Sequence, residues 1–198
     1  MALFTTRKLE SLAEATSFAN ERYAFARKSA GRILLEESQE PLRTFDIFLS
    51  HSFQDSKLIL VVKRGLEGLG YSVFVDWVEY PQLDRQHVTK EVAAFLRDVM
   101  EQSKSLFYVA TDNASHSNWM PWECGYFDGI KKLVAIMPVL RSDGGSDSFA
   151  GQEYLGLYYY VSGGTLKDTN QEGLWIHEDS STYVLYDKWV LGGKPTKH

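Results

Sequence analysis

The sequence predicts an α/β fold in which helices cover both faces of a mainly parallel β-sheet. Between residues 45 and 140, short apolar runs typical of buried strands alternate four times with amphipathic helical patterns. Such alternation is typical of right-handed βαβ units, whose strands run parallel. The chain has 198 residues, of which 44% are apolar and 24% charged, as in a globular domain with a buried core. We therefore expect one domain with a small appendage at most.

Residues 7–39 have the pattern of a helix. They contain no proline and one glycine, and apolar or small residues recur at steps of three and four. The apolar seam includes alanines and Thr16, so two interpretations stay open: an assembly helix, and a helix that packs on its own domain. Pro41 ends the pattern, which defines an N-terminal helical segment over residues 1–41.

The first two predicted strands flank one amphipathic helix. Residues 45–50 (FDIFLS) form a short apolar run that predicts a buried strand. Residues 56–69 carry leucine and valine at helical spacing, and Gly70 follows where a helix C-terminus favours a residue that accepts positive φ. Residues 72–76 (SVFVD) predict the second strand.

A second amphipathic helix and two more strands follow. The helix is expected from about residue 88 to residue 103, with Val88, Val92 and Leu96 on one face. Residues 105–110 predict a strand, and a short helix is expected from about Trp119. Residues 133–139 predict the next strand, and Pro138 marks its expected end.

The last third of the chain has a different pattern. Residues 141–148 are rich in Gly, Ser and Asp, which indicates a loop. Residues 154–161, 174–177 and 183–191 are short aromatic-rich segments separated by turns. They predict a β-rich C-terminal extension over residues 141–198, packed on the domain, in which some segments are also compatible with helix.

Composition limits the partners. Lysine and arginine number 21 against 26 acidic residues, a net charge of -5, whereas a nucleic-acid binder needs a basic surface. The single cysteine, Cys124, fits a reducing compartment. The longest apolar run, residues 133–140, is too short to span a membrane, and the first residues lack a signal-peptide pattern. We therefore expect a cytoplasmic protein that binds neither nucleic acid nor membrane.

Polar and aromatic residues follow the predicted strands. Open α/β sheets bind ligands beyond the carboxyl ends of their strands. This rule points to residues 50–53 after the first strand, to Asp76 and Trp77 after the second, and to residues 111–123 after the next.

Some of these residues also have purely structural interpretations. An acidic residue in the first turn of a helix, as expected for Glu123, is favoured by the helix dipole alone. Trp122 is expected in the core, and Cys124, about 100° around the helix from Glu123, is expected to be a small buried thiol. Asp76 can cap its strand–loop junction. The sequence has no metal-ligand spacing and no glycine-rich phosphate loop, so no metal and no resident cofactor are expected.

Three motifs in register resemble the Toll/interleukin-1 receptor (TIR) domain. They are FDIFLS followed by His51 and Ser52, GYSVFVD at residues 70–76, and SNWMPWE at residues 117–123. The chain is most similar to stand-alone bacterial TIR proteins, in which a stretch like LDR at residues 83–85 also appears. The resemblance implies a TIR domain over residues 42–140, with a five-stranded parallel sheet of flavodoxin-like order whose short third strand falls near residues 82–85.

The resemblance also implies an activity. Enzymatic TIR domains carry a glutamate in the helix after the fourth strand, four residues beyond a tryptophan, and Trp119 and Glu123 have this spacing. The implied enzyme is an NAD+ glycohydrolase or ADP-ribosyl cyclase with NAD+ as its substrate. It would release nicotinamide and either ADP-ribose or a cyclic isomer, in bacterial anti-phage defence signalling. The sequence leaves the product and the trigger open.

One carboxylate is enough for this chemistry. Ordinary glycosidases need two because the leaving sugar oxygen must be protonated, whereas the nicotinamide ring of NAD+ is already positive and leaves as a neutral molecule. Glu123 is the predicted catalytic residue, which stabilises the oxocarbenium-like ribose and positions the acceptor. The predicted substrate-binding residues, from the strand ends and the resemblance, are Trp119, which would wall the nicotinamide site, and Ser50, His51, Ser52, Phe53, Phe74, Asp76, Trp77 and Arg85.

Two rival hypotheses remain at this stage. The first is a non-enzymatic TIR scaffold that acts through contacts between TIR domains, because many animal members only associate. The second is a flavodoxin-like nucleotide binder unrelated to TIR. For the enzyme, the resemblance implies a homo-oligomer formed through TIR–TIR contacts and a separate effector protein that responds to the nucleotide product.

Overall fold

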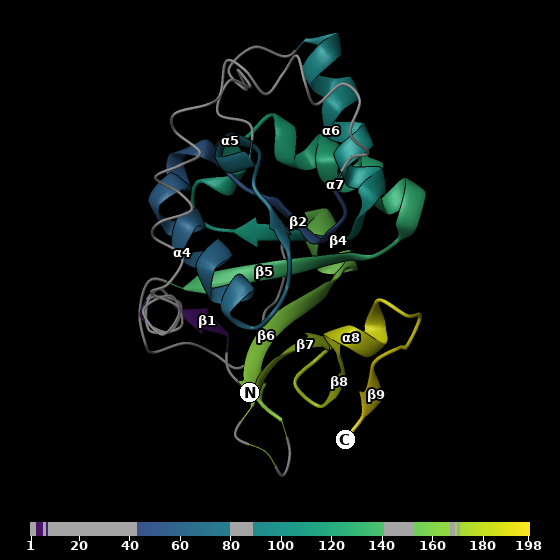
Figure 1. Ribbon diagram of the computed structural model, residues 1–198. Coiled ribbons are helices and arrows are strands. Elements are labelled where there is room, and N and C mark those ends of the chain that lie inside the picture. The colour runs from purple at the N-terminus through teal and green to yellow at the C-terminus, as the bar shows by residue number, and fades with distance from the viewer. Residues whose placement is uncertain are drawn as a thin grey trace.

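A computed structural model describes residues 3–5, 7, 43–79, 89–140, 153–166, 169 and 171–198 (Figure 1). Its strands form one sheet, in which eight of them follow the order β3-β2-β4-β5-β6-β7-β8-β9 and β1 pairs with β5. The strand bounds are β1 Phe4–Thr5, β2 Phe45–Ser50, β3 Val73–Phe74, β4 Ser103–Ala110, β5 Val134–Leu140, β6 Tyr159–Thr165, β7 Glu172–His177, β8 Thr182–Leu185 and β9 Thr196–Lys197.

Helices cover both faces of this sheet. The helix bounds are η3 Phe53–Asp55, α4 Ser56–Gly68, α5 Asp76–Glu79, α6 Lys90–Gln102, η4 Ala114–His116, α7 Trp119–Lys131, η5 Glu153–Leu157 and α8 Tyr186–Trp189. Successive residues of a strand point to opposite faces. In β4, Phe107 therefore packs in the core that includes α4 and α8, whereas Leu106 packs in the core that includes α6 and α7. Figure 1 shows α4 on one side of the sheet and α6 and α7 on the other.

Several predicted elements are confirmed. Strand β2 has the predicted bounds, and α4 ends one residue before the predicted position. Gly70 has a φ of 95°, as its position after α4 predicts. Helix α6 is capped by Thr89, whose side chain accepts a hydrogen bond from the backbone N of Val92 at 3.2 Å.

Other predictions are wrong in detail. The second strand is only Val73–Phe74, because Asp76 already begins α5 instead of ending a strand. The predicted short helix, α7, has 13 residues. Pro138 does not end β5, which continues to Leu140. Proline is tolerated there because the neighbour of β5 changes from β6, paired at Ile136, to β1, paired at Val139.

The C-terminal segment takes part in the same sheet. Among the described strands, β3, β2, β4, β5 and β6 run parallel in that order, and β1 also pairs parallel with β5. Strands β7, β8 and β9 then continue the sheet antiparallel. The predicted β-rich character is confirmed, although residues 183–191 contain α8 as well as part of β8. The boundaries at residues 41 and 140 stay predictions.

Strand β1 was not predicted, because two residues are too short to show a period. It pairs parallel with the end of β5. The helix predicted over residues 7–39 and the short strand predicted near residues 82–85 fall almost wholly outside the described residues. None of the helices that the structure describes has both the length and the apolar character that a membrane crossing requires.

Candidate active site

The predicted catalytic carboxylate lies beside the end of the first central strand. The Ser50 hydroxyl, on the last residue of β2, donates a hydrogen bond of 2.6 Å to Oε2 of Glu123 on α7. Hydrogen bonds between a hydroxyl and a carboxylate are short and strong when the carboxylate is charged. Both side chains are fully buried, at 0% exposure. The hydroxyl therefore fixes the orientation of the carboxylate.

The position of Glu123 in its helix differs from the prediction. Helix α7 begins at Trp119 with Asn118 as its N-cap, and its first turn contains no acidic residue. Glu123 is the first residue of the second turn, where the attraction of the helix dipole is already weaker. The dipole alone therefore explains this glutamate less well than the sequence suggested, and a buried carboxylate needs another reason to be there.

His51 is held between protein groups. Its Nδ1 lies 2.8 Å from the carbonyl oxygen of Leu49, which can only accept a hydrogen bond. Its Nε2 lies 2.9 Å from the indole N–H of Trp77, which can only donate. The ring is therefore neutral, with its proton on Nδ1. Because Nε2 is the acceptor, the 3.6 Å approach of Asp76 Oδ1 to Nε2 is not an ion pair in this state.

Two sets of hydrogen bonds, which the sequence did not predict, hold the loops around the site. Asp55, after β2, accepts hydrogen bonds from Thr111 Oγ1 at 2.5 Å and from Asn113 Nδ2 at 2.6 Å, both after β4. The buried amine of Lys63 on α4 donates to the carbonyl of Val73 and lies 3.1 Å from Glu79 Oε1 on α5. Asp55 carried one usable signal, since it lies just beyond a strand end like the residues that were predicted.

The other predicted site residues differ in burial, and not all of them lie near Glu123. Ser52 is buried beside His51, whereas Phe53 is 60% exposed. Phe74 is fully buried and stacks on Phe48 at 5.1 Å between ring centroids, with Phe45 edge-on at 5.3 Å. The structure thus brings Ser50 to Glu123 and joins His51 to Trp77, but it places Phe74 in the core. Arg85 lies outside the described residues.

Cys124 is a buried thiol, as predicted. It is 1% exposed, and burial raises its pKa to about 11. A thiol with such a pKa stays protonated at neutral pH, so Cys124 is unsuited to act as a nucleophile. Among the described residues, no three His, Cys, Asp or Glu side chains gather as a metal site would require.

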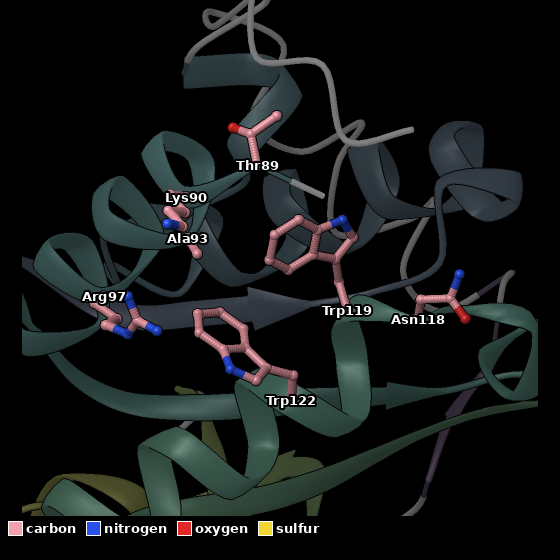
Figure 2. Close-up of a pocket in the computed structure, with 7 residues that line it drawn as sticks. All are labelled: Thr89, Lys90, Ala93, Arg97, Asn118, Trp119 and Trp122. Carbon is pink, nitrogen blue, oxygen red and sulfur yellow. The ribbon is translucent and has the colours of Figure 1, made fainter. Parts of the chain in front are cut away.

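Trp119 lies beside a cavity. It is 7% exposed and lines a cavity of about 400 Å³ between α6 and α7, which we call the α6–α7 cavity (Figure 2). Trp122, expected in the core, is half-buried and lines the same cavity. Glu123 does not line the cavity, but it lies one helical turn beyond Trp119 on the same helix.

Comparisons with known proteins give two relatives. No family model matches the sequence. Over 193 residues the chain is 48% identical to a Bacillus cereus (strain MSX-D12) protein with the provisional name 3′ cyclic ADP-D-ribose synthase ThsB′, covering 96% of this chain and 98% of that protein. Over 93 residues it is 33% identical to a Cytobacillus dafuensis protein with the provisional name cyclic ADP-D-ribose synthase TIR2, covering 46% of this chain and 24% of that protein.

Proposed function

This chain belongs to the stand-alone bacterial TIR-domain proteins, and from that premise we propose that it cleaves the nicotinamide–ribose bond of NAD+ and forms a cyclic ADP-ribose isomer. The observation that carries the proposal is the 48% identity, over 98% of that protein's length, to the Bacillus cereus protein with the provisional name 3′ cyclic ADP-D-ribose synthase ThsB′. The parallel sheet with helices on both faces agrees with the TIR fold. The protein is therefore an enzyme, and the scaffold hypothesis has no comparable support.

The reaction requires from the protein mainly a negative charge that is correctly positioned beside the ribose. The glycosidic C–N bond breaks, and its electron pair neutralises the nicotinamide ring. The ribose is left with oxocarbenium character, which a nearby carboxylate stabilises. We propose Glu123 for this role, and the Ser50 hydroxyl, 2.6 Å from Oε2, as the group that orients it.

The second half of the reaction decides the product. Attack on the ribose cation by a hydroxyl of the same molecule closes a ring and releases one proton, whereas attack by water gives ADP-ribose. Glu123, once the ribose cation has been consumed, is placed to accept that proton. Because the Glu123 carboxylate has no exposed surface, a neighbouring side chain must move before substrate reaches it.

The proposed function has a direct test. Purified protein is incubated with NAD+, and the products are separated and identified by mass spectrometry. We expect nicotinamide together with a product that has the mass of ADP-ribose less one water, the signature of cyclisation. Linear ADP-ribose as the only nucleotide product would support NAD+ cleavage but contradict cyclisation. The absence of nicotinamide, even at high protein concentration, would contradict both.

Replacing Ser50 by alanine tests the orienting role. The Ser50→Ala variant is expected to lower kcat about tenfold and to leave KM nearly unchanged, because the Ser50 hydroxyl, which the sequence assigned to substrate binding, donates its hydrogen bond to the reacting carboxylate. Steady-state nicotinamide release measures both constants. Ser105→Ala is a control, since Ser105 is a fully buried serine of the sheet whose hydroxyl bonds to the carbonyl of Asp46 and lies 3.0 Å from the hydroxyl of Tyr186. Equal kcat in Ser50→Ala and wild type would remove the orienting role.

Replacing Phe74 by leucine tests whether this residue binds substrate. Its ring lies wholly in the core, so Phe74→Leu is expected to lower the free energy of unfolding by about 1–2 kcal/mol and to leave KM for NAD+ unchanged. Urea unfolding and steady-state kinetics measure the two effects. A severalfold rise in KM with unchanged stability would restore the substrate-binding role that the resemblance implied.

Homo-oligomerisation, a separate effector protein and a role in anti-phage defence stay proposals that rest on the family resemblance. The proposed substrate and reaction do not depend on them.

A further inference from the structure

The α6–α7 cavity is lined by aromatic side chains that suit a planar ring. Its lining comes from two helices: Thr89 and then Lys90, Ala93 and Arg97 of α6, and Asn118, Trp119 and Trp122 of α7 or its N-cap. In Figure 2 the indoles of Trp119 and Trp122 both project from α7 toward α6. Their ring centroids are 5.4 Å apart and their planes meet at 75°. Two indoles at a steep angle offer a stacking face and an edge to an aromatic guest.

The charges around the cavity select the kind of guest. Lys90 and Arg97 are exposed cations, and no carboxylate is among the lining residues in the part of the chain that the structure describes. Arg97 lies 5.3 Å from the centroid of the Trp122 ring, so its guanidinium is held at the aromatic wall. Lys90 is the first residue of α6, at the positive end of the helix dipole. The cavity therefore favours an aromatic group that carries negative charge.

The two halves of NAD+ carry opposite charges. Its nicotinamide ring is a cation, which Lys90 and Arg97 would repel. Its adenosine half joins a neutral purine to the anionic diphosphate, which matches one indole face and one indole edge beside two cations. The volume of about 400 Å³ is within the range of small-molecule pockets, about 300–1,000 Å³.

We propose that the α6–α7 cavity binds the adenosine phosphate half of NAD+, with the purine against Trp119 and Trp122 and the diphosphate near Lys90. Trp119 then contacts the purine in place of the nicotinamide that the resemblance implies. This proposal rests on the proposed function. Trp119 joins the two regions, because it lines the cavity and lies one helical turn before Glu123. A dinucleotide anchored in the cavity would have its other half close to the carboxylate. The cavity is then a determinant of substrate specificity, separate from the reacting group.

The test compares two substrates and two charge reversals. Nicotinamide riboside has the same cationic ring and glycosidic bond as NAD+, but neither phosphate nor adenine. Lys90→Glu is expected to lower kcat/KM for NAD+ about tenfold, through KM, because reversal replaces an attraction by a repulsion. It is expected to leave kcat/KM for nicotinamide riboside unchanged. Lys188→Glu, at an exposed lysine of α8, is the matched control and is expected to change neither.

Two results would overturn the proposal while the enzyme remains active. One is an unchanged KM for NAD+ in Lys90→Glu. The other is an equal loss for both substrates, which would show a general effect on the site. A measurement without turnover separates this proposal from the proposed function: adenosine monophosphate is titrated while tryptophan fluorescence is followed. We expect quenching with a dissociation constant that rises about tenfold in Lys90→Glu only. If adenosine monophosphate does not quench wild type, the cavity is not its site, whatever the NAD+ assay gives.

Discussion

Replacing Glu123 by glutamine is expected to lower the rate of nicotinamide release from NAD+ by about 10³-fold or more. Glutamine has nearly the same shape but no charge, so it cannot stabilise the oxocarbenium-like ribose or accept the proton of the attacking hydroxyl. KM is expected to change little, because the proposed role concerns the transition state and not the binding of the ground state. Single-turnover release of nicotinamide at saturating NAD+ measures the effect.

The same substitution should not unfold the protein. Glu123 is fully buried, and burying a charged carboxylate costs more free energy than burying a neutral amide. The melting temperature of Glu123→Gln is therefore expected to equal or exceed that of wild type. Glu178→Gln, at an exposed glutamate after β7, is the control for the loss of one negative charge. Activity of Glu123→Gln within tenfold of wild type would refute the catalytic assignment. A strongly lowered melting temperature would instead assign Glu123 to the stability of the fold.

The second large effect is expected at Tyr186 in the C-terminal segment. Tyr186 is 1% exposed, and its ring packs edge-on against Tyr71 at 4.9 Å and against Phe107 at 5.6 Å. Its hydroxyl donates to the carbonyl of Asp46 at 2.8 Å and lies 3.0 Å from Ser105 Oγ. Burial raises its pKa well above the usual value, so the hydroxyl stays protonated and able to donate. Tyr186→Ala is expected to lower the free energy of unfolding by about 3–5 kcal/mol.

Chemical unfolding followed by circular dichroism and by tryptophan fluorescence measures this loss. We expect one transition that coincides for both probes, because α8 packs in the same core as α4 and β4. Tyr186→Phe keeps the ring and removes the hydroxyl, so it is expected to cost only about 0.5–1.5 kcal/mol. A loss below about 1 kcal/mol in Tyr186→Ala, or an early separate transition, would mean that the C-terminal segment unfolds independently of the rest.

Much of the fold could be predicted because it depends on local patterns. The apolar run at residues 45–50 indicates a strand, and the spacing of apolar residues over 56–69 indicates a helix, without any knowledge of the tertiary contacts. Where local signals competed, the prediction was wrong. The apolar run that ends at Asp76 looks like a longer strand, but helix α5 begins there, and Pro138 lies inside β5 because its neighbouring strand changes.

The candidate site was predicted in part, for a different reason. Strand ends share one edge of a parallel sheet, so Ser50 could be grouped with residues 111–123 without any coordinates. The sequence alone could not assign Phe74 to the core, since a strand residue near a sheet end can point either way. It also gave no sign of the α6–α7 cavity, because Lys90 and Arg97 look like ordinary charges on the exposed face of a helix.

The sequence by itself determined the fold class and the family, and it predicted the pair Trp119 and Glu123, because periodicity, motif order and helical spacing are all properties of neighbouring residues. The tertiary structure alone decided which groups touch: Ser50 with Glu123, His51 with Trp77, and Tyr186 with the core. It also added β6 to the parallel part of the sheet, beside β5. These outcomes join residues far apart in the chain, and they depend on strand register and on how helices pack on the sheet, which no local pattern encodes.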